Sequence, residues 1–324
     1  KKTICIGRSH GIHAEPTTFG LLWGMWKAEL DRDRERLSRA RDTIAVGKLS
    51  GAVGTYAHLD TEAEEYVLSR LGLDVEPIAT QVVQRDRHAE VFTTLAIMAA
   101  TLEKIAVEIR HLQRTEVGEV EEPFEQKQIG SSAMAYKRNP MRCERVCALA
   151  RIVMNLPANA LQTAAVQWME RTLDDSANRR ISLPESFLAL DGMLDVLGNV
   201  TDGLIVYEKR VQANLLKEMP FLATERLIME AVKNGADRQD AHEVVRAHAI
   251  EVARCIKEEA AENDLLERLG KEPMFAGIDL AGSTDPSTFI GLAAEQVDAF
   301  VQEVVDPLRS KYKDSPTQIA QLRV

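Results

Sequence analysis

The feature that most constrains the fold is a stripe of apolar residues whose spacing alternates strictly between four and three positions. Its members are Val91, Leu95, Met98, Leu102, Ile105, Ile109 and Leu112. This spacing places every member on one face of a long α-helix, where a helical bundle buries it. Similar stripes run through residues 18–47 and from Phe187 to Leu204, and no stretch alternates convincingly as a β-strand would. The sequence predicts an all-α, long-helix bundle.

A change of pattern near Val206 divides the chain into two predicted domains. Beyond it the helical stretches are shorter and are interrupted by Pro220, Asn234-Gly235, Ala276-Gly277 and Asp285-Pro286. Glycine and proline are the strongest local interrupters of secondary structure. We therefore expect a central long-helix bundle domain over residues 1–206 and a smaller C-terminal helical domain over residues 207–324.

Two shorter segments have local expectations of their own. Residues 8–20 combine two histidines with glycines and a proline and show no sustained period, so we expect a loop or the broken start of a helix. Pro157 lies inside an otherwise helical pattern, which predicts a break between a helix over residues 141–156 and another over residues 161–168.

Composition excludes several classes of protein. The 324 residues are 45% apolar, enough for a sizeable core, and their net charge of −10 disfavours nucleic acid or an anionic membrane as the main partner. No apolar run approaches the roughly 20 residues that span a bilayer, and the first residues lack the apolar stretch of a signal peptide. We therefore expect a cytoplasmic protein.

The four cysteines argue against a disulfide scaffold and against a metal site. They are Cys5, Cys143, Cys147 and Cys255, and none forms a Cys-x-x-Cys pair. Cys143 and Cys147 are four residues apart on a predicted helix. We expect them to be two buried, inert thiols on one helix face.

A polar run between two long helical patterns has the composition of a functional loop. It extends from Gln128 to Pro140 and reads Gln-Ile-Gly-Ser-Ser-Ala-Met-Ala-Tyr-Lys-Arg-Asn-Pro. Gly130 permits backbone angles that other residues avoid, the two serines offer hydroxyl groups, and Lys137 adds positive charge next to Arg138. These groups suit a loop that holds an anion. A surface turn with a solvated Lys-Arg pair is the alternative that the run alone leaves open.

This run and three further stretches resemble the adenylosuccinate lyase family of the fumarase/aspartase superfamily. The loop is similar to the signature Gly-Ser-Ser-x-Met-Pro-x-Lys-x-Asn-Pro, with Ala135 in place of the usual proline, a change that loosens the loop without removing a reacting group. The other stretches are residues 8–18, 80–86 and 170–180. Together with the long helices, the resemblance covers nearly the whole chain.

The resemblance implies roles for individual residues. The catalytic set comprises His10 at the reaction centre, Ser131 as the base, Lys137, and Glu144 as the residue that orients the site. The substrate-binding set comprises Ser9 (in place of the usual threonine), Gln81, Ser132, Asn139 and Arg145, with Arg171, Ser176 and Arg180 at the nucleotide phosphate. Taken alone, His10 has the alternative of a helix-capping loop histidine, and residues 170–180 that of a salt-bridged helix start.

The chemistry that the resemblance implies is a β-elimination of fumarate from a succinyl-amino nucleotide. One group must remove a proton from carbon and another must protonate the leaving nitrogen. A serine anion stabilised by loop N–H groups suits the first step, and a histidine, which titrates near neutrality, suits the second. Two guanidinium groups and a hydroxyl suit a phosphate dianion. The resemblance implies no metal and no organic cofactor.

The implied reactions belong to purine nucleotide biosynthesis: adenylosuccinate gives AMP, and the succinyl-carboxamide intermediate SAICAR gives AICAR. The family architecture implies a homotetramer with sites built from three subunits, and an N-terminal domain before the stretch at which this chain begins. Two alternatives remain open. A sister lyase acting on argininosuccinate has no need of the phosphate cluster, and a non-catalytic helical oligomerisation module is favoured by the long heptads.

Overall fold

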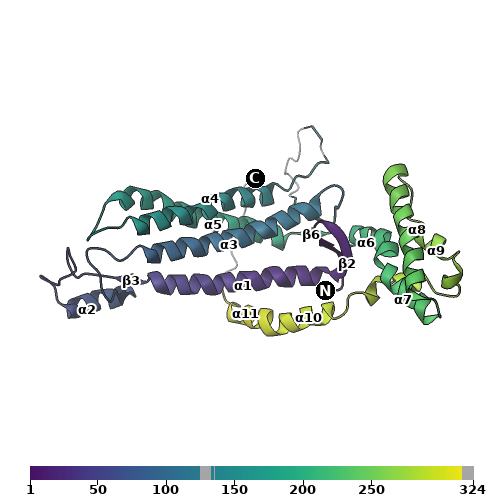
Figure 1. Ribbon diagram of the computed structural model, residues 1–324. Helices are drawn as coiled ribbons and strands as arrows, with labels where there is room; N and C mark the ends of the chain where they lie inside the picture. The colour runs from purple at the N-terminus through teal and green to yellow at the C-terminus, as the bar shows by residue number, and fades with distance from the viewer. Residues whose placement is uncertain (125–132, 135, 316–324) are drawn as a thin grey trace. The chain divides into compact units, whose positions relative to one another are not determined.

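The computed structural model describes residues 1–124, 133–134 and 136–315, and the chain folds into two compact units (Figure 1). The hairpin unit contains Lys1–Met25, Val117–Glu119 and Val206–Ser315. The bundle unit contains Trp26–Glu116 and Val120–Ile205. The chain therefore passes between units at several points, and the expected division at residue 206 marks one of them.

Long helices build the bundle unit. They are α1 (Phe19–Ile44, which begins in the hairpin unit), α3 (Asp86–Gln113), α4 (Met141–Ala165) and α5 (Asp174–Asp202). The shorter α2 (Thr61–Leu71) belongs to the same unit. Helix α3 packs along α4 and α5 (Figure 1). The predicted apolar stripe of α3 forms this contact, since all of its members except the half-buried Met98 are buried. The prediction of an all-α bundle fold is confirmed.

Two prolines lie inside helices of the bundle, and the predicted break at Pro157 is wrong. Helix α4 continues through Pro157, and α5 continues through Pro184. A proline removes one N–H donor and disturbs one turn. Helix α4 packs against α3 and α5, and this packing outweighs the lost hydrogen bond.

The expectation of a loop or a broken helix start at residues 8–20 is also wrong, because a β-hairpin occupies most of this segment and α1 begins only at Phe19. Strands β1 (Ile4–Ser9) and β2 (Ile12–Thr18) pair antiparallel, with an irregularity between Ile6 and Arg8. The buried Ile6 packs on Leu215 and Met219 of α6. Each strand is too short to show a sustained period, so tertiary packing decides its conformation.

Shorter helices complete the hairpin unit. They are α6 (Glu208–Leu222), α7 (Thr224–Lys233), α8 (Arg238–Glu259), α9 (Leu265–Leu269), α10 (Ala293–Phe300) and α11 (Asp306–Lys311), with a π-helical turn at Val301–Val305. A core that includes residues of α7, α8 and α9 is formed by Leu227, Val245, Leu265 and Phe275, all nearly inaccessible to solvent.

The remaining strands have two residues each. They are β3 (Val46–Gly47), which pairs parallel with β4 (Asp74–Val75), and β5 (Val120–Glu121) and β6 (Ile205–Val206). None of the helices that the structure describes is long and apolar enough to span a membrane. Cys143 and Cys147 are buried on one face of α4, as predicted.

Candidate active site

The residues predicted to form the site fall into three groups. Ser9 and His10 lie in the hairpin unit, and the other two groups lie in the bundle unit. These are the phosphate cluster (Gln81, Arg171, Ser176 and Arg180) and the α4 group (Lys137, Asn139, Glu144 and Arg145). Ser131 and Ser132 are outside the described residues. Each group is built by different local physics.

Ser9 and His10 are displayed at the exposed tip of the β1–β2 hairpin. Ser9 pairs with Ile12 across the strands, so His10 and Gly11 form a two-residue turn. Both have positive φ, 56° for His10 and 76° for Gly11, as in a type I′ turn. Glycine adopts this conformation freely, whereas a histidine in it is uncommon. The hairpin therefore holds the His10 side chain at an exposed tip rather than in a core.

The α4 group owes its position to a carboxylate that caps the helix. Pro140 precedes α4 and offers no side-chain acceptor. Instead, the buried Glu122 accepts hydrogen bonds from the backbone N–H groups of Arg142 (3.1 Å) and Cys143 (2.7 Å). These N–H groups would otherwise lack partners at a helix start. The cap fixes the first turn of α4, on which Glu144 and Arg145 are exposed.

The two basic residues that precede α4 differ in their surroundings. Arg138 forms an ion pair with Glu121 (2.7 Å) and lies over the ring of Phe124. The exposed Lys137 ammonium has no ion pair with any residue that the structure describes. Of this pair, Lys137 is the cation available to a ligand.

Contacts between segments 90 residues apart in sequence bring the residues of the phosphate cluster together. The hydroxyl of Thr80 donates to the carbonyl of Glu170 (3.2 Å), which brings Gln81 towards Arg171. The buried Asp175 forms ion pairs with Arg85 at the start of α3 and with Arg179 on α5, both at 3.0 Å. The structure therefore brings together two stretches that the sequence analysis matched separately.

The first turns of α5 present two faces. Asp175 and Arg179 are four residues apart and point inward, where the Asp175 carboxylate holds both arginines. Ser176 and Arg180 have the same spacing one position further on, and Arg180 is exposed. Among the described residues, nothing forms an ion pair or hydrogen bond with the side chains of Arg171, Ser176 or Arg180. These side chains are available to an anion.

The electrostatics around Asp175 keep a neighbouring histidine neutral. Burial, followed by the positive charges of Arg85 and Arg179, lowers the pKa of His88 to about 4. Burial also lowers the pKa of Arg85 from its ordinary value, and Arg179 adds to this effect. A neutral His88 avoids a third positive charge beside the two arginines.

The supports of the phosphate cluster, which are Arg85, Asp175 and Arg179, were not predicted from the sequence. The signal was present in the repeated spacing of four residues, since Asp175 and Arg179 immediately precede Ser176 and Arg180. Two overlapping pairs with this spacing indicate a helix with one face for support and another for a ligand.

Within the bundle unit, the phosphate cluster and the α4 group lie at opposite ends of α4. The last turn of α4 meets the start of α5 through a hydrogen bond from Asn178 to the Thr163 hydroxyl (3.0 Å). The first turn instead lies near the end of α3, where Gln113 donates to the carbonyl of Arg138 (3.2 Å). The 25 residues of α4 make this separation roughly 35 Å.

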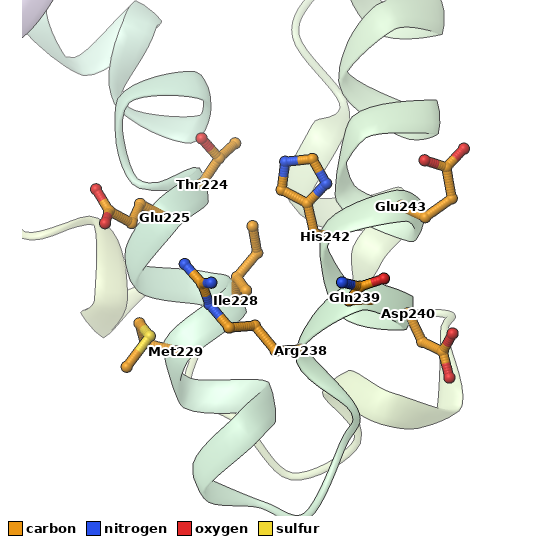
Figure 2. Close-up of a pocket in the computed structure, with 9 residues that line it drawn as sticks. All are labelled: Thr224, Glu225, Ile228, Met229, Arg238, Gln239, Asp240, His242 and Glu243. Atoms are coloured by element: carbon orange, nitrogen blue, oxygen red, sulfur yellow. The ribbon is translucent and has the colours of Figure 1, made fainter.

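A separate groove of about 900 Å³ lies between α7 and α8 (Figure 2). Arg238 and His242 project from α8 into the gap that Ile228 enters from α7. Carboxylates also line the groove, including Glu225 and Asp240. It contains none of the predicted site residues, and no set of three or more metal-ligating side chains is gathered in the described chain.

Comparisons with known proteins identify the family of the chain. A lyase family model matches residues 1–155, and a model of the adenylosuccinate lyase C-terminus matches residues 220–300. The adenylosuccinate lyase of Schizosaccharomyces pombe is 44% identical over 97% of this chain and 67% of its own length. That of Saccharomyces cerevisiae is 46% identical over 93% of this chain and 65% of its own length. The chain belongs to the adenylosuccinate lyase family.

The fold of the family agrees with that of solved structures. A fumarate lyase from Mesorhizobium sp. BNC1 superposes with a TM-score of 0.77 at 29% identity, covering 93% of this chain and 67% of its own. A 3-carboxy-cis,cis-muconate lactonizing enzyme from Pseudomonas putida gives the same TM-score at 28% identity, with coverage of 93% and 66%. The predicted carbon–nitrogen lyase assignment and the fumarase/aspartase fold are confirmed. The chain spans about two thirds of the length of these relatives.

Proposed function

We propose that this chain acts in purine nucleotide biosynthesis by releasing fumarate from adenylosuccinate, which leaves AMP, and from SAICAR, which leaves AICAR. We infer the substrate class from the phosphate cluster. Arg171, Ser176 and Arg180 offer two guanidinium groups and a hydroxyl without competing partners in the described chain. Such a set suits a phosphate dianion. A lyase acting on argininosuccinate, which has no phosphate, has no use for it.

The proposed elimination divides its proton transfers between two side chains. Ser131 removes a proton from the carbon next to a carboxylate, and electrons from the broken C–H bond form the new C=C bond of fumarate. Lys137 and Asn139 stabilise the negative charge that develops on that carboxylate. His10 protonates the nitrogen as the C–N bond breaks. General acid and base steps of this kind each contribute about 100 to 10,000-fold in rate.

We propose further that the active protein is a homo-oligomer, a tetramer in this family, in which different copies supply different groups. The support is the separation of roughly 35 Å along α4, which exceeds the length of a nucleotide. Exposed apolar side chains also line α4 and α5 and suit burial against another copy. They are Ile152, Leu161, Ile181, Phe187, Leu188 and Leu194.

The direct test is fumarate release from adenylosuccinate. It is measured for this chain alone and for the chain joined to the part of the Schizosaccharomyces pombe relative that it does not cover. We expect Ser131→Ala to lower kcat by at least 100-fold with AMP binding retained, because only the base is lost. Argininosuccinate serves as the control substrate. Near-normal turnover of the Ser131→Ala variant would remove Ser131 from the mechanism, and turnover of argininosuccinate alone would contradict the nucleotide assignment.

A mixing experiment tests the shared site. Lys137→Ala and Arg180→Ala remove side chains at opposite ends of α4, and each variant is expected to be inactive alone. If one site takes Lys137 from one copy and Arg180 from another, mixed oligomers contain some sites with both residues intact. Activity should therefore return on mixing. Mixed oligomers without any activity would contradict shared sites. The cytoplasm remains the predicted compartment, which cell fractionation would check.

A further inference from the structure

A buried carboxylate lies at the base of the hairpin that carries His10. Glu119 is fully buried, and it accepts a bidentate pair of hydrogen bonds from the Arg8 guanidinium. Arg8 Nη2 lies 2.6 Å from Glu119 Oε1, and Arg8 Nη1 lies 3.2 Å from Oε2. Arg8 is only two residues before His10. A paired fork of this kind fixes direction as well as distance.

Glu119 is itself held by helix α6. The Asn214 side chain donates to Glu119 Oε1 (2.9 Å) and to the carbonyl of Val117 (2.9 Å). The backbone N–H of Tyr207 donates to the carbonyl of Glu119 (2.9 Å), and Arg210 donates to that of Val117 (3.0 Å). The segment Val117–Glu119 is therefore fixed on α6 at several points, which makes it a rigid base for Arg8.

On each strand of the hairpin, a side chain near the turn contacts a carboxylate. On β1, Arg8 forms the buried ion pair with Glu119, and on β2, His13 Nδ1 lies 3.3 Å from the carboxylate of Glu218 on α6. Arg8 and His13 are paired across the hairpin. The turn beyond them, from Ser9 to Ile12, is exposed. The hairpin is thus anchored on both strands within three residues of His10.

The two contacts differ in strength. The Glu119 side chain is fully buried and the Arg8 side chain is 22% exposed, whereas His13 is 39% exposed and Glu218 27%. Exposed ion pairs contribute little because water and salt screen them. The Cys5 thiol beside the buried pair stays protonated, because burial and the charge of Glu119 raise its pKa to about 12. The Arg8–Glu119 pair is therefore the main polar anchor of the hairpin.

We propose that Glu119 is a positioning residue for the elimination, acting through Arg8 to hold His10 where it protonates the leaving nitrogen. The inference rests on the proposed function, in which His10 is the proton donor. A misplacement of about 1 Å can cost on the order of 100-fold in rate. Loss of the Arg8–Glu119 pair should therefore lower kcat and leave nucleotide binding, which the bundle unit provides, nearly unchanged.

The test is a double-mutant cycle between Glu119→Gln and His10→Gln, measured as kcat for fumarate release. The variants are made in the form that releases fumarate without substitutions, which is either the chain alone or the chain joined to the uncovered part of the Schizosaccharomyces pombe relative. We expect Glu119→Gln alone to lower kcat at least tenfold, with KM and the AMP affinity within threefold of wild type. In the His10→Gln background the same change should have little further effect, because the group that it positions is already gone. Arg8→Lys, which keeps the charge but loses the fork, should give a smaller loss.

Val252→Ala is the matched control, because Val252 is fully buried in the core of the hairpin unit and belongs to a different cluster from the hairpin. It should lower thermal stability while leaving kcat unchanged at temperatures where the protein is folded. An equal loss of kcat from Glu119→Gln with and without His10 would overturn the positioning role, as would a kcat within threefold of wild type. If Glu119→Gln is insoluble, Arg8→Lys decides by the same criteria. A wild type without turnover would overturn the proposed function and this inference with it.

Discussion

The two supports of the candidate site, Asp175 in the bundle unit and Glu119 in the hairpin unit, use one chemical solution on two kinds of scaffold. Each is a buried carboxylate that forms an ion pair with an arginine close in sequence to a predicted site residue. Asp175 joins two rigid helices and holds two arginines. Glu119 anchors a hairpin whose tip has positive φ and is exposed. The predicted ligand-binding residues are therefore positioned by helix register, and His10, the proposed proton donor, is positioned by a turn.

The two supports also differ in how fully their polar atoms are satisfied. Both oxygens of Glu119 accept hydrogen bonds. By contrast, Asp175 Oδ1 and Arg179 Nε are buried without a hydrogen-bond partner in the described structure. Arg179 Nε lies within ion-pair distance of the other carboxylate oxygen, Asp175 Oδ2. A buried cluster that is only partly satisfied depends strongly on each charge that remains. The bundle support should consequently be the more sensitive of the two to substitution.

The largest expected effect is that of Asp175→Asn. Removing this charge leaves Arg85, which is buried, and Arg179 without their counter-ion. Breaking a buried ion pair on one side costs about 3 to 5 kcal/mol of unfolding free energy. We expect a loss of that size in urea unfolding, with weaker AMP binding as α5 shifts. The exposed neighbour Asp174 offers a control, and Asp174→Asn should change little. Equal unfolding free energies for Asp175→Asn and wild type would show that the bundle support is not electrostatic.

A smaller effect comes from His88, beside the same support. Its pKa is about 4 in the folded protein, below the ordinary histidine value of 6.5 that the unfolded chain should show. Between these values the unfolded chain binds a proton that the folded chain does not, so the folded state loses stability as pH falls. From pH 7 to pH 5 this amounts to about 2 kcal/mol. His88→Gln should remove that part of the acid sensitivity, measured by urea unfolding at both pH values. The same pH dependence in the variant would assign it to other groups.

The bundle could be predicted from sequence because its signals are local and repeated. The stripe from Val91 to Leu112 lies on one helix and nearly all of it is buried. The residues of the phosphate cluster were predicted from the family resemblance, as two separate stretches. In the structure the two stretches are in contact, because Thr80 contacts Glu170 and Arg85 contacts Asp175. Pro157 misled the prediction because packing along α4 outweighs one missing N–H.

The hairpin was not predictable by the same means. Its strands have six and seven residues, and Gly7 and Pro16 interrupt the alternation that would identify them. What holds it is non-local: Arg8 pairs with a carboxylate 111 residues away, and Ile6 packs on α6. Glu119 itself lies in an acidic run, Glu119-Val120-Glu121-Glu122, that sequence alone reads as a solvated surface. Burial separates Glu119 and Glu122 from an ordinary surface charge.

The smallest of the three effects is expected at Gly11 and isolates the turn itself. Its φ is 76°, and open space surrounds the position that a Cβ would occupy, so Gly11→Ala meets conformational strain without a clash. That strain costs about 1 kcal/mol of unfolding free energy, and kcat should fall with it as the tip of the hairpin shifts. Gly11→Asn should lose less unfolding free energy, because asparagine tolerates positive φ.

His10→Asn separates the turn from the chemistry. Asparagine is favoured at the first position of a type I′ turn, so the unfolding free energy should stay unchanged while kcat falls by at least 100-fold. A His10→Asn variant that loses stability and activity together would assign His10 to the turn rather than to proton donation.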